Sequence, residues 1–343
     1  MKKMLLIEPK NLEPSRKDFE VIGVFNPGIV KFNDEYLMIA RVAERVKQDD
    51  PEHYLVPHYV HGKGMQIIKL PKNSPDYDYS DSRIIKNHQK NYLTSISHFR
   101  IVRSKDGLNF DFSNNEFIMP SGIYEEYGIE DPRITQIEDK YYITYSAVSS
   151  CGINVSLKVT KDFINFTQFG NILHSDNKDC VIFPEKINDK YYALHRPSIS
   201  QFGKLDIWTA ESNNLINWGN HKIMLDARVT YTESSRVGSG AVPILTDRGW
   251  LEIYHSADIH DHYHLTAMLL DKDDPNKILM KSKQVLIQPT EDYERNGFVK
   301  DVVFSCGLIK EEDEIIIYYG VCDERIACAK LTIDEIWENM EVL

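Results

Sequence analysis

The chain has 343 residues, of which 42% are hydrophobic and 11% aromatic, a composition typical of globular proteins. Its formal net charge of −12 argues against nucleic acid or an anionic membrane as a partner, because both bind basic surfaces. The N-terminal sequence MKKMLLIEPK has only a short apolar run, and no stretch suits a signal peptide or a membrane span, so we expect a cytoplasmic protein.

A hairpin pattern recurs along the chain. Each copy has an apolar run, a polar turn with an aspartate, and an aromatic or β-branched strand; the copies are 28–42, 133–148, 185–197, 241–257 and 307–321. Such alternation around short polar turns is typical of antiparallel hairpins. A second strand pair follows most copies, at 100–112, 155–169 and 206–220, and more weakly at 264–278 and 326–340. Two hairpins would make one four-stranded unit.

The turn aspartates mark the period of this repeat: Asp34, Asp139, Asp189, Asp247 and Asp313. The last three intervals each suit one blade of a β-propeller, and the first is longer because about residues 43–95 hold an insertion. We therefore predict that residues 1–343 form a single all-β domain, a five-bladed β-propeller with a central active-site channel and a short C-terminal helix. The alternative is a β-sandwich, in which five similar units are hard to arrange.

Polar residues precede the first strand of each predicted blade, at 25–28, 129–133, 177–186, 233–243 and 296–307. In a propeller these positions face one end of the channel, and loops on a rigid scaffold commonly carry function. Four basic residues hold related positions in different repeats: Arg41, Arg196, Arg236 and His255. In an acidic protein, their convergence predicts an anion site, and phosphate suits guanidinium groups. Singly, each could instead be a surface ion pair or a satisfied core histidine.

Ordered motifs give the chain a resemblance to a known family. They are NPG (26–28), SHFRIVRSKDG (97–107), GIEDPRIT (128–135), VIFPEKI (181–187), HRP (195–197), RVGSGAVPI (236–244), GWLEIYH (249–255) and VVFSCG (302–307). In this order they resemble glycoside hydrolase family 130, the β-mannoside phosphorylases and a minority of β-mannosidases. The resemblance covers about residues 20–330, and the fold it implies is a five-bladed propeller.

The resemblance implies an inverting exchange of a β-mannosidic bond for α-mannose 1-phosphate. Asp131 of the EDPR motif matches the general acid, whose proton is thought to pass through a hydroxyl of the mannosyl residue. Arg196, Arg236 and His255 match the phosphate-binding residues, although the family often has lysine where Arg236 stands. Inorganic phosphate would be a co-substrate, and neither an organic cofactor nor a metal is implied.

Further residues match substrate-binding positions: Asn26, Arg41, Glu130, Asn177, Lys178 and Asp301. Many members have asparagine where Asp301 stands, which leaves its role open. Glu130 would orient Asp131 or hold a sugar hydroxyl, or it is only structural. Pro132 should hold Asp131 in an extended conformation, and Arg133 should contact Glu130 or the backbone, because pairing with the acid would lower its pKa.

The basic residues favour a phosphorylase over a hydrolase. An inverting hydrolase needs an acid and a base carboxyl, whereas phosphate is already a nucleophile. A carboxylate beside the phosphate would repel it. We expect a β-1,2-mannobiose or β-1,2-manno-oligosaccharide substrate; the alternatives are β-1,4 substrates, a β-mannosidase and a non-catalytic sugar-binding protein. The loops at 43–66 and 258–264 should select the acceptor sugar, and the first could equally be a dimer contact in a homo-oligomer.

Two groups of residues that could bind a metal lack the spacing of a metal site. The run HDHYH (260–264) has no further ligand at zinc spacing, so a polar loop is the better interpretation. The five cysteines also lack metal-type spacing, which favours free thiols in a reducing cytoplasm.

Overall fold

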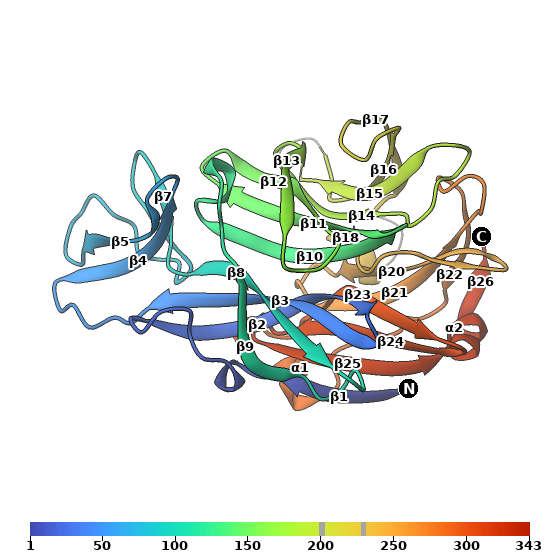
Figure 1. The fold of residues 1–343 in the computed structure, drawn as a ribbon, viewed down its shortest axis with the longest axis horizontal. Helices are drawn as coiled ribbons and strands as arrows, with labels where there is room; N and C mark the ends of the chain where they lie inside the picture. Colours follow the sequence, from blue (N-terminus) through green and yellow to red (C-terminus); the bar gives the residue numbers. More distant parts are fainter. Residues whose placement is uncertain (199–202, 228–230) are drawn as a thin grey trace.

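The computed structural model describes residues 1–198, 203–227 and 231–343, and its regular structure is almost entirely antiparallel β-strand (Figure 1). The strands are rich in Val, Ile, Tyr and Phe, which favour a pleated, half-buried conformation. The prediction of an all-β protein is confirmed. Over the described ranges, no helix is both long and apolar enough to cross a membrane.

Most strands belong to meanders, in which strands that follow one another in the chain pair side by side. Meander 1 comprises β2 (Phe19–Phe32), β3 (Glu35–Val46), β8 (Ile96–Ser104) and β9 (Asp111–Ile118). Meander 2 comprises β10 (Gly128–Ile137), β11 (Lys140–Ser149), β12 (Gly152–Thr160) and β13 (Phe166–Leu173). Meander 3 comprises β14 (Asn177–Ile182), β15 (Tyr191–Pro197), β16 (Ile207–Ser212) and β17 (Trp218–Leu225). A parallel contact of Gly128 with Ser97 joins the first two meanders into one sheet.

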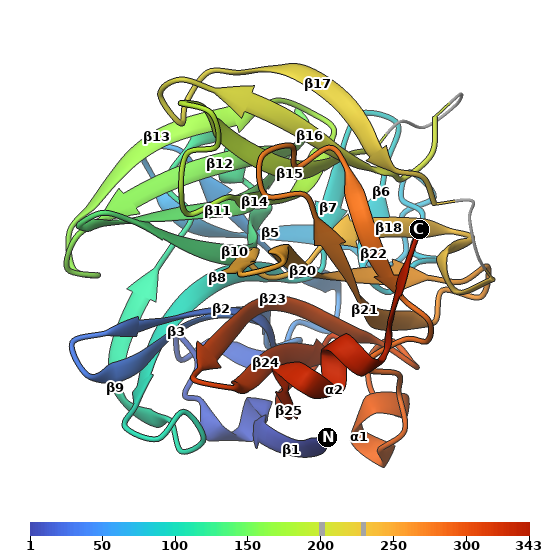
Figure 2. The same ribbon diagram turned by 90° about the vertical axis from the view of Figure 1, so that its right-hand side faces the viewer.

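The remaining meanders bring the two ends of the sequence into the sheets. Meander 4 comprises β18 (Arg236–Ser239), β19 (Ile244–Thr246), β20 (Gly249–Ala257), β21 (Tyr263–Leu270) and β22 (Ile278–Ser282), with β26 (Met340–Val342) at its edge. Meander 5 comprises β23 (Val303–Glu311), β24 (Glu314–Val321) and β25 (Arg325–Thr332), with β1 (Lys2–Ile7) as its outer strand. Figure 2 shows β1 beside β25.

Two hairpins lie between β3 and β8, where the insertion was expected: β4 (His53–Val60) with β5 (Gly64–Pro71), and β6 (Ile84–Lys86) with β7 (Asn91–Leu93). The β4–β5 hairpin extends away from the meanders at the left of Figure 1. Strand β3 itself continues to Val46. The helices are short: η1 (Pro9–Asn11), η2 (Ile123–Glu125), η3 (Tyr231–Glu233), α1 (Asp292–Arg295) and α2 (Ile333–Glu338). Thr332 begins α2, the C-terminal helix, with a capping box to Glu335.

Five apolar clusters of the core each join two meanders. They join meander 1 to 2 around Phe99 and Tyr145, 2 to 3 around Leu157 and Ile182, 3 to 4 around Phe183 and Trp250, 4 to 5 around Ile253 and Ile317, and 5 to 1 around Tyr318 and Met38. The order of contacts is therefore cyclic. Each fully buried side chain of this kind contributes roughly 1.5–3 kcal/mol, so packing between meanders holds the molecule together.

A buried Glu–Tyr–Lys contact recurs in three meanders. In each, a glutamate from the short helix before the first strand accepts hydrogen bonds from a tyrosine on the strand paired with the first and from a lysine on a strand further out. The three sets are Glu125, Tyr145 and Lys158; Glu233, Tyr254 and Lys281; and Glu294, Tyr319 and Lys3. The contact fixes the segment that leads into the first strand against the body of the meander.

Candidate active site

A cavity of about 610 Å³ collects residues from the first and second strands of several meanders. Seven of the ten predicted site residues line it: Asn26, Arg41, Glu130, Asp131, Lys178, Arg196 and Arg236. They come from β2, β3, β10, β14, β15 and β18, so residues far apart in sequence meet at one place. The prediction that polar residues near the first strands converge is thus met for these seven residues.

A repeated β-bulge orients polar side chains in three first strands. The strand register shifts at Phe25–Gly28, Glu130–Arg133 and Lys178–Val181. Within these bulges Asn26, Asp131 and Asp179 have φ angles of 47°, 54° and 53°. The prediction that Pro132 holds Asp131 in an extended conformation is therefore wrong. The bulge supplies an extra residue to the strand, and its geometry outweighs the usual preference of a residue before proline.

Asp131 sits in a network of donors. Its Oδ1 accepts hydrogen bonds from Asn26 Nδ2 at 2.8 Å and from Arg41 Nη1 at 2.9 Å, while Arg41 Nη2 donates to Glu130 Oε1 at 2.7 Å. Burial of the Asp131 carboxyl raises its pKa, but the charges of Arg41, Arg133 and Lys178 outweigh burial and hold the pKa below its usual value. Asp131 is consequently ionised near neutral pH in the unliganded protein.

Arg133 is a buried residue that holds backbone segments of the site in place. It donates to the backbone carbonyls of Asp131, Ser239 and Gly240 at 3.0–3.1 Å and to Asp179 at 3.2 Å. Of the two contacts predicted for Arg133, the backbone contact is present, whereas Glu130 pairs with Arg41. Arg133 therefore ties the bulge of β10 to the segment that follows β18.

Asp179 lines the cavity and was not among the predicted site residues. Its fully buried carboxylate lies 3.0 Å from Arg196 Nη1, 3.2 Å from His255 Nε2 and 3.2 Å from Arg133 Nη2. A carboxylate thus lies beside the predicted basic residues, although one close to phosphate would repel it, because the buried arginines need a counter-charge. Gly238 packs so closely against Asp179 and His255 that a Cβ would overlap both.

His255 lies behind the cavity and does not line it. Burial lowers the pKa of His255 to about 4, although Asp179 acts in the opposite direction, so the imidazole is neutral near pH 7. Two other predicted residues also lie outside the lining. Asn177 Oδ1 contacts His195 Nδ1 at 3.1 Å, and the carbonyl of Asp301 accepts a hydrogen bond from Tyr263 N at 3.0 Å.

Asp323 lines the cavity and was not predicted. Burial, assisted by the negative charges of Asp131 and Glu130, raises the pKa of Asp323 to about 6. Asp323 follows β24, the second strand of meander 5, and so holds a place related to those of Arg41 and Arg196. Only basic residues were expected at these positions, so an acid there was not predicted.

The insertion between β3 and β8 and the 258–264 segment both border the cavity, but the part of the insertion that does so is not the one expected. From the insertion, Arg83, Ile84, Leu93 and Ser95 contribute lining residues, whereas the β4–β5 hairpin contributes none. Of the predicted acceptor loop at 43–66, only Ala43 lines the cavity, because the first hairpin extends outward (Figure 1). The 258–264 segment does border the cavity, through Asp261 and Tyr263.

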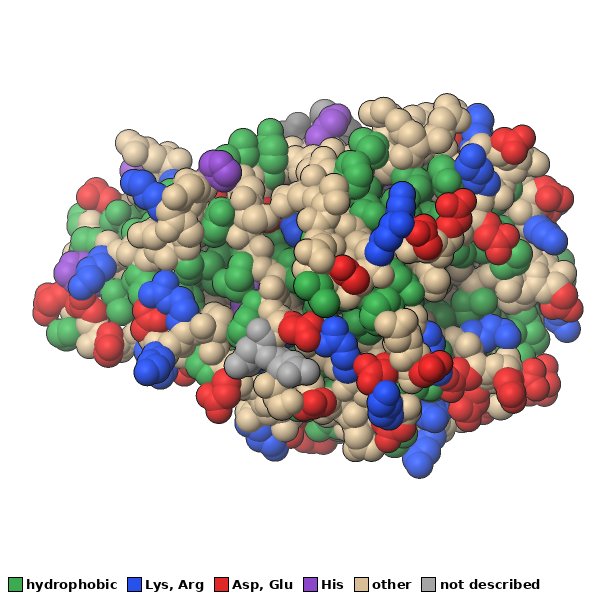
Figure 3. Space-filling view, viewed as in Figure 1, with side chains coloured by type: hydrophobic (Ala, Val, Ile, Leu, Met, Phe, Trp, Pro, Cys, Tyr) green, Lys and Arg blue, Asp and Glu red, His purple; other side chains and the backbone are tan. Residues whose placement is uncertain are grey.

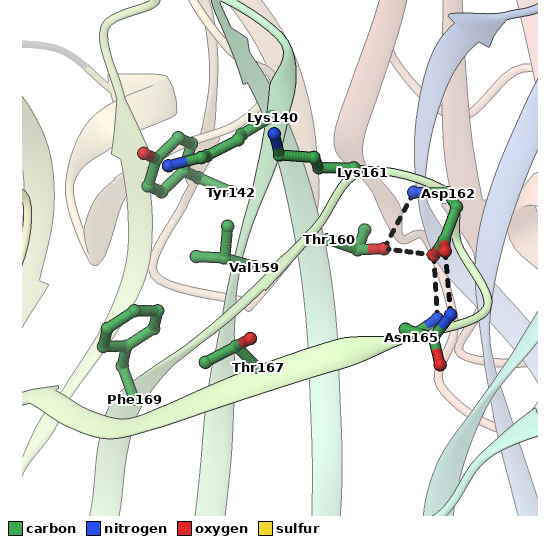
Figure 4. Close-up of a pocket in the computed structure, with 9 residues that line it drawn as sticks. All are labelled: Lys140, Tyr142, Val159, Thr160, Lys161, Asp162, Asn165, Thr167 and Phe169. Carbon is green, nitrogen blue, oxygen red and sulfur yellow. Dashed lines mark hydrogen bonds between the residues drawn. The ribbon is translucent and has the colours of Figure 1, made fainter.

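A second hollow, of about 370 Å³, lies on β11, β12 and β13 (Figure 4). Its polar residues serve the local turn: Thr160, Asp162 and Asn165 hydrogen-bond to one another. It lacks the converging charges of the larger cavity. Within the described ranges, no group of three or more His, Cys, Asp or Glu residues could hold a metal ion.

Residues 78–342 match glycoside hydrolase family 130, described as beta-1,4-mannooligosaccharide phosphorylase. The chain belongs to this family. This family-130 chain is 45% identical to a beta-1,2-mannobiose phosphorylase of Listeria innocua, over 98% of this chain and 96% of the relative. It is 38% identical to a 1,2-beta-oligomannan phosphorylase of Thermoanaerobacter sp., over 71% of this chain and 82% of the relative.

The structure of the family-130 chain is also close to a solved one. The Listeria innocua beta-1,2-mannobiose phosphorylase, in complex with beta-1,2-mannobiose, superimposes with a TM-score of 0.93 and 43% identity, covering 99% of each chain. A more distant relative, the beta-1,4-mannooligosaccharide phosphorylase of Ruminococcus albus, is 33% identical over 68% of this chain and 73% of the relative. The resemblance read from the motifs is confirmed.

Proposed function

We propose that this protein is an inverting phosphorylase that cleaves β-1,2-mannobiose, or short β-1,2-manno-oligosaccharides, with inorganic phosphate to give α-mannose 1-phosphate. The observation that carries the proposal is the near full-length similarity to the Listeria phosphorylase, in sequence and in structure. The clustered acids and cations of the cavity agree with it.

Asp131 is the proposed general acid. It is held rigidly by Asn26 and Arg41, as proton transfer requires. Because its pKa is lowered, Asp131 must gain a proton as the substrates bind. A phosphate anion near Lys178 would offset one of the charges that lower this pKa. The glycosidic oxygen would receive the proton, through a mannosyl hydroxyl, while a phosphate oxygen forms the new bond to the anomeric carbon from the opposite face.

Arg196 and Arg236 are the proposed phosphate ligands, with Lys178 beside them. Among the described residues, Lys178 has no carboxylate within ion-pair distance, and Arg196 Nε is buried without a hydrogen-bond partner. Both groups therefore keep donors for an anion. His255 would act indirectly, as a neutral residue that helps to position Arg196, since the two contact each other at 3.3 Å.

The sugar would lie against the opposite wall of the cavity. Asn26, Arg41, Glu130 and Asp323 are the groups available there for mannosyl hydroxyls. The insertion residues 83–95 would border the acceptor sugar. Roles for Asn177 and Asp301 in binding remain predictions, and neither residue lines the cavity.

We further propose that the five meanders are the blades of a propeller around this cavity within one domain spanning residues 1–343. The cyclic order of the apolar clusters supports this arrangement. The protein would act in the cytoplasm, with a mannoside and phosphate as its partners and without an organic cofactor or metal, and homo-oligomers are compatible with the exposed insertion.

A product assay tests the proposal. The protein is incubated with β-1,2- and β-1,4-mannobiose, each with and without phosphate. We expect mannose 1-phosphate from the β-1,2 substrate only when phosphate is present. Free mannose without phosphate would identify a hydrolase, turnover of only the β-1,4 substrate would overturn the linkage, and no product from either would indicate a sugar-binding protein.

A further inference from the structure

One of the proposed phosphate ligands, Arg236, forms an ion pair with an acidic side chain. The Asp261 carboxylate forms an ion pair with Arg236 Nη2, and both residues line the cavity. Asp261 belongs to the loop between β20 and β21, whereas Arg236 begins β18. The pair therefore links a loop at the mouth of the cavity to a first strand.

The loop that carries Asp261 has a defined shape. Asp258 Oδ1 accepts hydrogen bonds from the backbone N–H groups of His260 and His262 at 2.7 and 3.1 Å, and Asp258 O accepts one from Asp261 N at 3.1 Å. His262 Nδ1 lies 3.0 Å from Asp258 Oδ2. These contacts fix the turn that presents Asp261.

Arg236 is also held in place independently of Asp261. Its Nη1 donates to the Tyr263 hydroxyl at 3.0 Å, and the guanidinium carbon lies 5.6 Å from the centre of the Tyr263 ring. Displacing the Asp261 carboxylate would therefore leave Arg236 positioned for another anion.

We propose that the Asp261 carboxylate binds Arg236 when phosphate is absent and competes with phosphate for this arginine. Asp261 would thereby set the affinity of the protein for phosphate. The inference rests on the proposed function, because it takes phosphate as the anion that Arg236 binds. It adds a residue that tunes the phosphate site without contacting the sugar.

Two carboxylates beside the cations differ in a way that suits this role. Asp179 is fully buried between Arg133, Arg196 and His255, so removing it would leave uncompensated charges. The Asp261 side chain is 62% exposed, so water can solvate it once phosphate has taken its place. An exposed ion pair is weak and readily exchanged. Asp179 is thus a permanent counter-ion and Asp261 a displaceable one.

The test compares Asp261→Asn with the natural protein. Calorimetry measures the Kd for inorganic phosphate, and phosphorolysis of β-1,2-mannobiose gives the KM for each substrate. We expect the Kd and KM for phosphate to fall roughly two- to fivefold, as loss of an exposed ion-pair competitor predicts. The KM for mannobiose should stay within about twofold. The gain should shrink in high salt, which screens the pair.

Two matched variants isolate the effect. Asp247→Asn removes the same charge from an exposed turn of meander 4 outside the cavity lining, and it should leave phosphate binding unchanged. Asp261→Glu keeps the carboxylate and should bind phosphate as the natural protein does. Equal melting temperatures would show that all variants fold alike.

Unchanged or weaker phosphate binding by Asp261→Asn would overturn the inference, and so would a selective rise in the KM for mannobiose, which would make Asp261 a sugar contact. The proposed function fails separately. If the natural protein makes no mannose 1-phosphate, the phosphorylase proposal is lost, whereas calorimetry with phosphate alone still decides the role of Asp261.

Discussion

Asp131 has a strained backbone conformation, and its carboxylate accepts strong hydrogen bonds. A positive φ is unusual for a residue other than glycine and is tolerated best by Asn and Asp. The EDPR motif, together with the order of the other motifs, could identify Asp131 as a candidate acid, since both are visible in the sequence. The β-bulge at Asp131 could not be predicted from the motif, because the bulge depends on how β10 pairs with β11. Asp179 was missed for the same reason: its partners Arg133, Arg196 and the neutral His255 come from other segments.

Removing the Asp131 charge should stop catalysis without unfolding the protein. In Asp131→Asn, we expect kcat to fall by about 10²- to 10⁴-fold, the usual contribution of a general acid. The melting temperature should change little, because Arg41 keeps its contact with Glu130. Steady-state kinetics and circular dichroism measure the two effects. Asp189→Asn, in an exposed turn, is the control; a variant at position 131 that keeps most of its kcat would mean that another group donates the proton.

Asp323 should make stability depend on pH. Its folded pKa of about 6 lies above the ordinary value of 3.8, so the folded state favours the protonated carboxyl. The natural protein should lose stability as pH rises from about 4 to 6 through this group, on the order of 2 kcal/mol. Asp323→Asn should lack that loss. Urea unfolding at pH 4.5 and 7 measures it, and an equal pH dependence in both proteins would contradict the raised pKa.

The hairpins of all five meanders follow from one local sequence pattern. Alternating apolar residues and polar turns were sufficient to predict the hairpins, because strand periodicity and turn chemistry are local properties. The course of the insertion was not predictable, since the direction of the β4–β5 hairpin depends on packing against other segments. The Glu–Tyr–Lys contact was also invisible, because its members are distant in sequence. It gives three meanders the same fixed start to their first strands.

Loss of one hydroxyl should test that contact. Tyr145→Phe removes the donor that lies 2.7 Å from Glu125 Oε1 and leaves a buried carboxylate and Lys158 less well satisfied. We expect a loss of about 1–3 kcal/mol in the free energy of unfolding. Tyr192→Phe is the matched control, because its hydroxyl has only a 3.4 Å contact with Glu211. Equal losses in urea titrations of the two variants would contradict a special role for the buried set.

For the molecule as a whole, the net charge is negative, and the cations proposed to bind phosphate are gathered in the cavity. Figure 3 shows acidic and basic side chains interspersed on the visible face, while the cavity brings Arg41, Lys178, Arg196 and Arg236 together with a similar number of acids. A net charge of −12 could exclude large polyanions from the sequence alone. Composition could not locate the cationic cluster, which exists only when residues from several meanders come together.

The contact between Lys3 and Glu294 joins the N-terminal strand to the segment before β23. Both side chains are nearly buried and lie 2.7 Å apart. Lys3→Met should cost about 3–5 kcal/mol of unfolding free energy, because it leaves a buried carboxylate without its cation. Lys2→Met, on the exposed side of the same strand, should cost little. Urea unfolding distinguishes them; a loss for Lys3→Met no larger than that for Lys2→Met would show that the pair adds nothing.

The pairing of β1 with β25 has a consequence for biosynthesis. On the ribosome, residues 2–7 are made more than three hundred residues before their partners at 325–332. Until then the edge of β1 has no native strand to pair with, and an unpaired edge is prone to association with other chains. Meander 5 therefore cannot complete its pairing before β25 is made, and until then the nascent protein depends on its other meanders, or on a chaperone, to keep β1 from wrong partners.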